Sequence, residues 1–137
     1  MSALEKREEA KLVKWLQSHK IKWKKKATGE LLDRWIFLPM GHLFIIELKR
    51  KDKGQLSRRQ ENEIRDLRKL GYDVEVHDNA QQAIEAVELR LEAAFLSAQG
   101  REVYASKLLR GSVTRSRIRE DKYKHRSTQN SSKRKTD

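Results

Sequence analysis

Two opposite charges end the most apolar stretch of the sequence, residues 43–49 (LFIIELK). Because side chains alternate across a β-strand, Glu47 and Lys49 would project from the same face of that strand. A hairpin that turns at residues 39–42 would bring Asp33, on the partner strand, to roughly the level of Glu47. Two carboxylates and one ammonium group would then meet at one end of a sheet.

That set of groups suits the hydrolysis of a phosphodiester. Two carboxylates can hold Mg²⁺ or Mn²⁺ while leaving positions for water and a phosphate oxygen, and the metal makes the water more acidic. A neighbouring lysine can orient the water or stabilise the pentacovalent phosphorane. The alternative is an ordinary salt bridge at a strand end, which is the commoner meaning of Glu and Lys two residues apart.

Four short segments have the composition of β-strands. Residues 34–38 (RWIFL) and 43–49 flank a short turn and predict a hairpin, and the lysine-rich residues 20–26 predict an edge strand. Residues 72–77 alternate valine with charged residues and end on His77. None of the four histidines has paired metal-ligand spacing, so we expect each at the surface or in a turn.

Apolar residues at helical spacing predict three helices. The first covers residues 3–18; the second begins with a capping box of Ser57 and Gln60 and ends at Gly71; Asn79 caps the third. The predicted order is α-β-β-β-α-β-α. A helix between the last two strands makes them parallel, which predicts an α/β domain whose mixed sheet is flanked by helices in two or three layers.

These elements follow one another in a specific combination: LLDR, LFIIELK, GQLSRRQ and LGYDVEVHDNAQQAIEAV. The segment from about residue 8 to 88 resembles the VRR-NUC family of the PD-(D/E)XK nuclease superfamily, in its stand-alone phage and bacterial form. The resemblance implies a restriction-endonuclease-like core.

The resemblance also assigns roles at the end of the central strand. By it, Asp33 and Glu47 would bind Mg²⁺ or Mn²⁺, the carbonyl of Leu48 could add a ligand, and Lys49 would be the catalytic lysine. Family members usually have proline before the metal-binding aspartate, whereas this sequence has Leu32. Proline there would only pre-set the backbone, so its loss leaves the chemistry possible.

Two further site residues follow from the resemblance. Gln60 would be the family's glutamine beside the site, although glutamine three residues after a cap serine also reaches back to the cap. Both roles are compatible. The family carries an acidic residue on its first helix, where this sequence offers Glu5, Glu8 and Glu9. We favour Glu9 slightly over Glu8, as a catalytic and metal-binding residue; a solvated surface charge is the alternative.

The net charge of +12 predicts a polyanionic partner, because clustered lysines and arginines displace counterions from nucleic acid. Seven basic residues lie in the predicted edge strand, in the loop after Lys49 and in the first turn of the helix predicted after that loop. They are the candidate nucleic-acid contacts: Lys24, Lys25, Lys26, Lys51, Lys53, Arg58 and Arg59. A loop of this kind is also commonly charged because it is exposed.

The charge is unevenly distributed along the chain. Residues 1–100 carry 20 Lys and Arg against 16 Asp and Glu, and residues 101–137 carry 12 against 4. From Gly111 onward, sizeable hydrophobic residues are too few to offset the entropy of ordering. We therefore predict a nuclease-like domain over residues 1–100 and a basic, largely disordered tail over residues 101–137.

Three features that the sequence lacks bear on where the protein acts and on whether it contacts a membrane. The chain has no cysteine, no apolar run of about 18 residues, and no signal-peptide core at its N-terminus. We expect a protein of the cytoplasm, bacterial or of a phage-infected cell, without a membrane partner.

These observations predict a metal-dependent DNA nuclease acting on double-stranded DNA or on branched DNA such as four-way junctions. The resemblance implies a homodimer. One alternative is a non-catalytic nucleic-acid-binding or assembly protein that keeps the fold, and another is a small RNA-binding accessory protein that acts through its tail.

Overall fold

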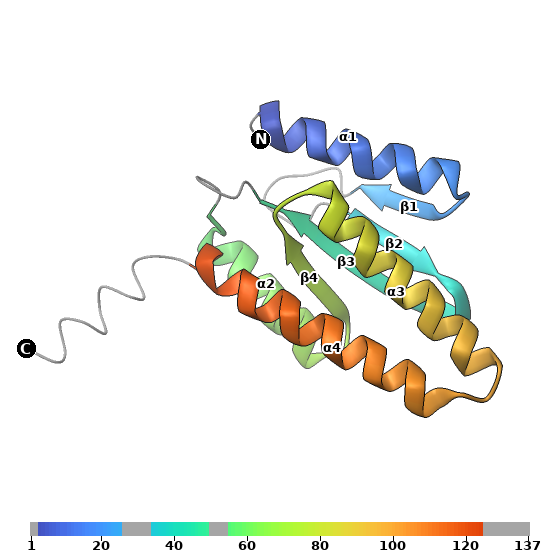
Figure 1. Cartoon of the computed structure of the whole chain (residues 1–137). Helices are drawn as coiled ribbons and strands as arrows, with labels where there is room; N and C mark the ends of the chain where they lie inside the picture. The colour runs from blue at the N-terminus through green and yellow to red at the C-terminus, as the bar shows by residue number, and fades with distance from the viewer. Residues whose placement is uncertain (1–2, 26–33, 50–54, 125–137) are drawn as a thin grey trace, which may run out of the picture.

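The structure, a computed structural model, describes residues 3–25, 34–49 and 55–124. They form a four-stranded sheet with helices packed around it (Figure 1). The elements in chain order are α1 (Ala3–Ser18), β1 (Lys22–Lys25), β2 (Arg34–Leu38), η1 (Pro39–Gly41), β3 (His42–Leu48), α2 (Arg58–Lys69), β4 (Asp73–His77), α3 (Ala80–Ala98), α4 (Glu102–Glu120) and η2 (Asp121–Tyr123). The predicted α/β class and the order of elements as far as α3 are confirmed.

The sheet has the strand order β1-β2-β3-β4. β2 and β3 form the predicted antiparallel hairpin, with Arg34 opposite Ile46, and β3 pairs with β4 in parallel. At the hairpin turn, Met40 and Gly41 both have positive φ (64° and 72°), a conformation that glycine adopts without steric cost. Because α2 connects the parallel pair, the sheet is mixed, as the sequence predicted.

One core lies between the sheet and the helices α1 and α3. Phe44, Ile46 and Leu48 project from β3 into it, where they meet Leu12 and Leu16 of α1. The α3 side of this core is made largely of alanines, which let the helix approach the sheet closely. Every second residue of β3 therefore faces α1 and α3.

A second core lies on the opposite face of the sheet, where α2 packs. Its buried members come from β3 and β4, from α2 and from the chain before and far after α2: Ile45, Leu56, Ile64, Val74, Val76 and Tyr123. Since β3 contributes alternate residues to the two cores, helices lie on both faces and the domain has three layers.

The N-terminus of α2 is fixed by a complete capping box. The backbone N–H of Gln60 donates to the Ser57 hydroxyl (3.1 Å), and the Ser57 N–H donates to the Gln60 side-chain carbonyl (3.0 Å). At the other end Gly71 has φ +93°, which allows the chain to leave the helix and enter β4. Both predicted boundaries of this helix are confirmed.

The prediction for residues 101–137 is wrong over its first part, because Glu102–Glu120 form the helix α4. α4 packs against α3 and runs beside β4, the strand at one edge of the sheet (Figure 1). The residues that it buries are mainly small, Ala105, Ser112 and Ser116. A count of large hydrophobic residues misses such a contact, which depends on close approach rather than on bulk. Residues 125–137 lie outside the described residues.

α3 and α4 have 19 residues each. Within the described part of the chain, no helix combines the length and the apolar character needed to cross a bilayer.

Candidate active site

Glu47 is the central acidic residue of the candidate site. It lies one residue before the end of β3, and its side chain projects on the same face as Ile45, toward α2. The residue is only 2% exposed. A buried carboxylate is costly unless hydrogen bonds and opposite charge compensate it. Neighbouring groups must therefore compensate the buried carboxylate of Glu47.

Lys49 supplies the opposite charge. Its ammonium group lies 3.5 Å from a carboxylate oxygen of Glu47. That distance exceeds the roughly 2.7 to 2.9 Å of a strong charge-assisted hydrogen bond. The backbone N–H of Lys49 donates to the carbonyl of His77 at 2.9 Å, so the end of β3 is held on β4. The backbone of Lys49 is thus fixed, whereas its ammonium group lies near the Glu47 carboxylate without a strong hydrogen bond to it.

Gln60 links the site to the start of α2. Its side-chain N–H₂ donates to Glu47 at 3.1 Å, while its side-chain oxygen accepts the Ser57 N–H of the capping box. The two contacts suggested for this glutamine therefore occur together in one side chain. Because the cap fixes the amide group, the Glu47 carboxylate has a partner of fixed position.

Asp33 lies outside the described residues, as do Lys26, Lys51 and Lys53. The residue that follows it in the chain, Arg34, pairs with Ile46, the residue before Glu47. The hairpin register is thus the one on which the proximity of Asp33 and Glu47 was predicted. The role of Asp33 stays a prediction.

Glu9 reaches the sheet from α1. It is 7% exposed and forms ion pairs with Arg34 of β2 and with Lys25 of β1, the latter at 3.0 Å. Arg34 also lies over the ring of Trp23, 4.5 Å from its centroid, and Trp23 packs on the core under α1. Glu9 is therefore a buried, paired carboxylate rather than a solvated surface charge.

Glu8, the neighbouring candidate, has a different partner. Its carboxylate accepts the backbone N–H of Ala80 at 2.9 Å, in the first turn of α3. This hydrogen bond lowers the pKa of Glu8, and Lys11 at 3.1 Å acts in the same direction. Glu8 thus serves to dock α1 on α3.

The remaining predicted nucleic-acid contacts within the described residues lie on two elements. Lys24 and Lys25 are exposed on the edge strand β1, and Arg58 and Arg59 are exposed in the first turn of α2. Arg58 and Arg59 directly precede Gln60, so they flank the Glu47 group. The ammonium group of Lys25 is paired with Glu9.

Whether a divalent metal ion fits this site depends on the side chains that could bind it. Within the described ranges there is no group of three or more acidic or histidine side chains that could hold a metal ion. Glu47 is nonetheless a hard oxygen donor of the kind that Mg²⁺ and Mn²⁺ require, placed at a strand end. Asp33 would be the second carboxylate, and the donor types of the pair fit a divalent cation.

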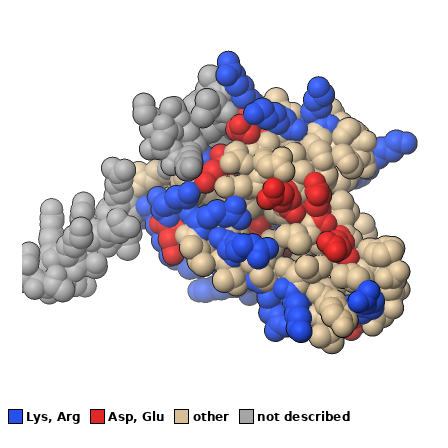
Figure 2. All heavy atoms as spheres, viewed as in Figure 1, with Lys and Arg blue, Asp and Glu red and all other residues tan. Residues whose placement is uncertain are grey.

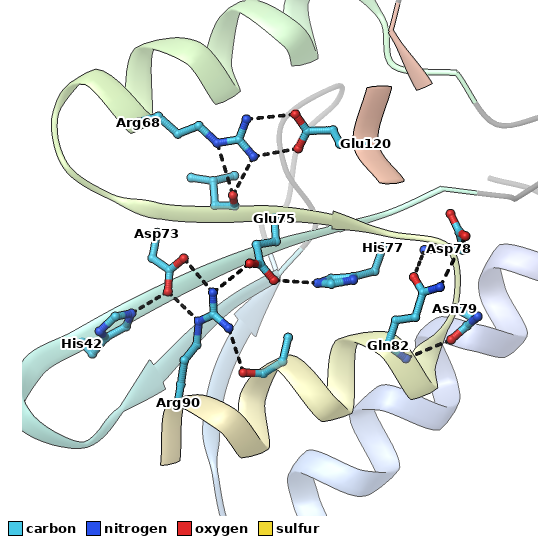
Figure 3. A network of polar contacts seen from close by, with 12 residues as sticks. His42, Arg68, Asp73, Glu75, His77, Asp78, Asn79, Gln82, Arg90 and Glu120 are labelled. Carbon is cyan, nitrogen blue, oxygen red and sulfur yellow. Dashed lines mark hydrogen bonds and ion pairs between the residues drawn. The ribbon is translucent and has the colours of Figure 1, made fainter. Parts of the chain in front are cut away.

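A second polar cluster, which sequence reasoning missed, lies on the opposite face of β4 (Figure 3). Its centre is the guanidinium of Arg90, from α3, which donates to both carboxylate oxygens of Asp73 (2.6 and 2.9 Å) and lies 3.0 Å from Glu75. Glu75 in turn contacts His77 at 2.9 Å, and Asp73 contacts His42 at 2.7 Å.

Burial and pairing act in opposite directions on this cluster. Burial alone would raise the pKa of Asp73, but hydrogen bonds from His42 and Arg90 outweigh it and lower that pKa to about 2. For Arg90, burial would lower the pKa, and Asp73 and Glu75 together raise it. Asp73 and Arg90 therefore stabilise each other's charged forms at the centre of a largely buried network.

The surface position expected for the histidines is wrong for His77, which is 1% exposed. The alternation in residues 72–77 predicted a strand with one polar side. α3 covers that side and supplies Arg90, so the polar residues are buried with their counter-ion. The signal that could have revealed this is the lone arginine within the alanine-rich α3.

Comparison with known proteins supports the fold. No protein-family model and no curated protein matches the sequence. A solved structure of a "VRR_NUC domain" superposes with a TM-score of 0.55 at 20% sequence identity, and the match covers 64% of this chain and 97% of that one. The chain therefore has a VRR_NUC-like α/β fold, as its sequence pattern predicted.

Proposed function

We propose that the protein is a metal-dependent nuclease that hydrolyses phosphodiester bonds in DNA. The observation that carries the proposal is the grouping of Glu47, Lys49 and Gln60 at the end of β3 in a VRR_NUC-like fold. A fold alone does not imply an activity, so the argument depends on this group of side chains.

Asp33 and Glu47 would hold Mg²⁺ or Mn²⁺, with the carbonyl of Leu48 as a proposed further ligand. Glu9, also proposed as a ligand, would have to exchange its ion pairs with Arg34 and Lys25 for the metal. The bound ion would supply Lewis acidity and lower the pKa of a water molecule. Gln60 orients the Glu47 carboxylate through its capped amide. Lys49, close to Glu47 but loosely engaged, can donate hydrogen bonds to the attacking water or to the negative charge that develops on phosphate.

The proposed substrate is double-stranded or branched DNA, including four-way junctions, with a homodimer as the acting form. The excess of basic residues supports a polyanionic substrate. Action in the cytoplasm of a bacterium or a phage-infected cell completes the proposal.

The test is cleavage of supercoiled plasmid and of a synthetic four-way junction with Mg²⁺, with Mn²⁺ and with EDTA. Wild type should cut only with metal, and Glu47→Gln should reduce the rate by on the order of 100-fold or more, because a metal ligand matters at least as much as the groups that orient it. Glu85→Gln, the same change on the exposed side of α3, is the control. Binding of DNA without cutting under either metal would favour the non-catalytic binding protein.

A further inference from the structure

A groove separates α2 from α4 on the side of the molecule away from α1. It has a volume of about 950 Å³. One wall is α2, from Glu61 to Lys69, and the other is the second half of α4 with the residues that follow it, from Val113 to Lys124. The groove exists only because residues 102–124 are ordered.

The groove is lined by five basic and three acidic side chains. Two of the acidic side chains, Glu120 and Asp121, are held in ion pairs. Glu120 accepts two hydrogen bonds from Arg68 (2.6 and 2.9 Å), and Asp121 pairs with Lys124 at 2.8 Å. By contrast, Lys69 and Arg117 form no ion pair with any residue in the described part of the chain. Their charges are available to a ligand.

The charge of Arg68 also acts on Arg117. Burial lowers the pKa of the Arg117 guanidinium and Arg68 lowers it further, while Glu120, Glu75 and Asp73 act in the opposite direction. Arg68 cannot turn away, because it is held by Glu120 and also donates to the carbonyl of Val74 at 2.8 Å. Two guanidinium groups that repel each other across a groove would both be stabilised by an anion placed between them.

An apolar strip accompanies these charges. Ile118 is 70% exposed although it is a large hydrophobic residue, and Val113 lies one helical turn before Arg117 on the same wall. A ligand that carries both regular negative charge and flat apolar groups would match both features. An unpaired nucleic-acid strand is such a ligand, since its bases are exposed.

The groove begins at the candidate active site. Leu56 is part of its lining, and the backbone N–H of Leu56 donates to the carbonyl of Tyr123 at 3.0 Å. Glu61, also in the lining, follows Gln60, whose side chain contacts Glu47. A strand lying in the groove would therefore lead directly to the end of β3.

The distribution of surface charge favours a nucleic-acid path along α4 over one along α3. In the view of Figure 2, acidic side chains gather over the middle of the face, and basic side chains gather beside them toward the C-terminal end of α4. The exposed side of α3 carries Glu85, Glu88 and Glu92, whereas α4 carries Arg115, Arg117 and Arg119. A polyanion would be repelled from α3 and attracted to α4.

We propose that the α2–α4 groove binds the phosphodiester backbone of an unpaired nucleic-acid strand, with Lys69 and Arg117 as its main phosphate contacts. The proposal deepens the proposed nuclease function and rests on it for the identity of the ligand. It assigns to α4 a substrate-binding role beyond covering the edge of the sheet.

The test measures binding without cutting. Fluorescence anisotropy in EDTA would follow a labelled 20-nucleotide single strand, and a duplex of the same length, at several salt concentrations. The double substitution Lys69→Gln with Arg117→Gln should weaken single-strand binding about five- to tenfold and reduce the salt slope by about two. The matched control, Lys107→Gln with Arg115→Gln, removes the same charge from exposed positions of α4 outside the groove. It should change the Kd less than twofold.

Each outcome has a defined meaning. Equal losses in the groove variant and in the control would overturn the groove as a site, and a loss seen only with the duplex would overturn the unpaired strand as its ligand. If the groove variant binds and cuts like wild type, the groove proposal fails and the nuclease proposal stands. If wild type binds the strand with a loss confined to the groove variant but never cuts, the groove stands and the nuclease proposal fails.

Discussion

Two polar clusters lie on opposite faces of the same pair of parallel strands, and they are held very differently. On the α3 face, the side chain of Arg90 is 1% exposed and binds Asp73 and Glu75 at 2.6 to 3.0 Å. The carbon of its guanidinium also lies 3.7 Å from the centroid of the Phe44 ring. On the α2 face, the charge opposite Glu47 is a lysine at 3.5 Å.

The difference distinguishes structure from function. An arginine with two carboxylates at short distances in a closed interior has no capacity left for a ligand, so its role is to hold α3 on β4. Lys49 lies where β3 ends, and its long ion pair with Glu47 leaves its ammonium group able to engage another group. The contrast predicts that the first cluster dominates stability and the second dominates activity.

Removing Arg90 should have the largest effect on stability. Arg90→Met keeps much of the side-chain volume but leaves Asp73 and Glu75 buried without their cation, which typically costs about 3 to 5 kcal/mol. Urea unfolding at neutral pH measures this loss. Arg101→Met, which removes an exposed arginine whose guanidinium lies over the ring of Tyr104, is the control and should cost under about 1 kcal/mol. A comparable cost for both would contradict the structural role of the cluster.

Acid should weaken the same cluster by a smaller amount. The pKa of Asp73 is lowered from 3.8 to about 2 on folding, so its contribution is fully present above about pH 4 and is lost as the pH falls toward 2. The loss amounts to roughly 2 kcal/mol. Unfolding free energies at pH 5 and pH 2.5 should differ less in Asp73→Asn than in wild type. Asp66→Asn, at an exposed carboxylate, should keep the wild-type dependence.

The capping box offers a finer comparison at the candidate site. Ser57→Ala and Gln60→Ala each remove one half of the box and should each cost about 1 kcal/mol of unfolding free energy. Only Gln60→Ala also removes the hydrogen bond to Glu47. It should therefore lower cleavage at a given fraction folded, whereas Ser57→Ala should not. Equal cleavage rates in the two variants would assign Gln60 to the cap alone.

Lys49→Ala should have the smallest effect on stability. Its ion pair with Glu47 is long, and its backbone hydrogen bond to His77 does not need the side chain. We expect a change of about 1 kcal/mol or less in thermal unfolding. A loss as large as that of Arg90→Met would show that the two clusters do the same structural work, and the comparison would fail.

The elements that the sequence predicted well are those with local signals. Ser57 with Gln60, Gly71 and Asn79 mark helix ends through their own backbone chemistry, and all three boundaries are observed. The strand residues 43–48 were predicted from composition and alternation. The positions of Glu47 and Lys49 on one face follow directly from these elements.

The features that the sequence did not predict depend on partners distant along the chain. The polar side of β4 is buried because Arg90, 17 residues after Asp73, folds back over it. α4 packs through Ser112 and Ser116, residues that count as polar in any sequence window. Neither contact leaves a periodic apolar signal, so neither could be predicted from the sequence.

The central claim is that the end of β3 is a nuclease active site, and the cleavage rate of Lys49→Ala tests it most directly. Single-turnover nicking of supercoiled DNA in Mn²⁺ would compare this variant with wild type after thermal unfolding has shown both to be folded. The account predicts a loss of about 100- to 1,000-fold, the usual cost of removing one group that stabilises developing charge. Cleavage by Lys49→Ala at the wild-type rate would contradict it.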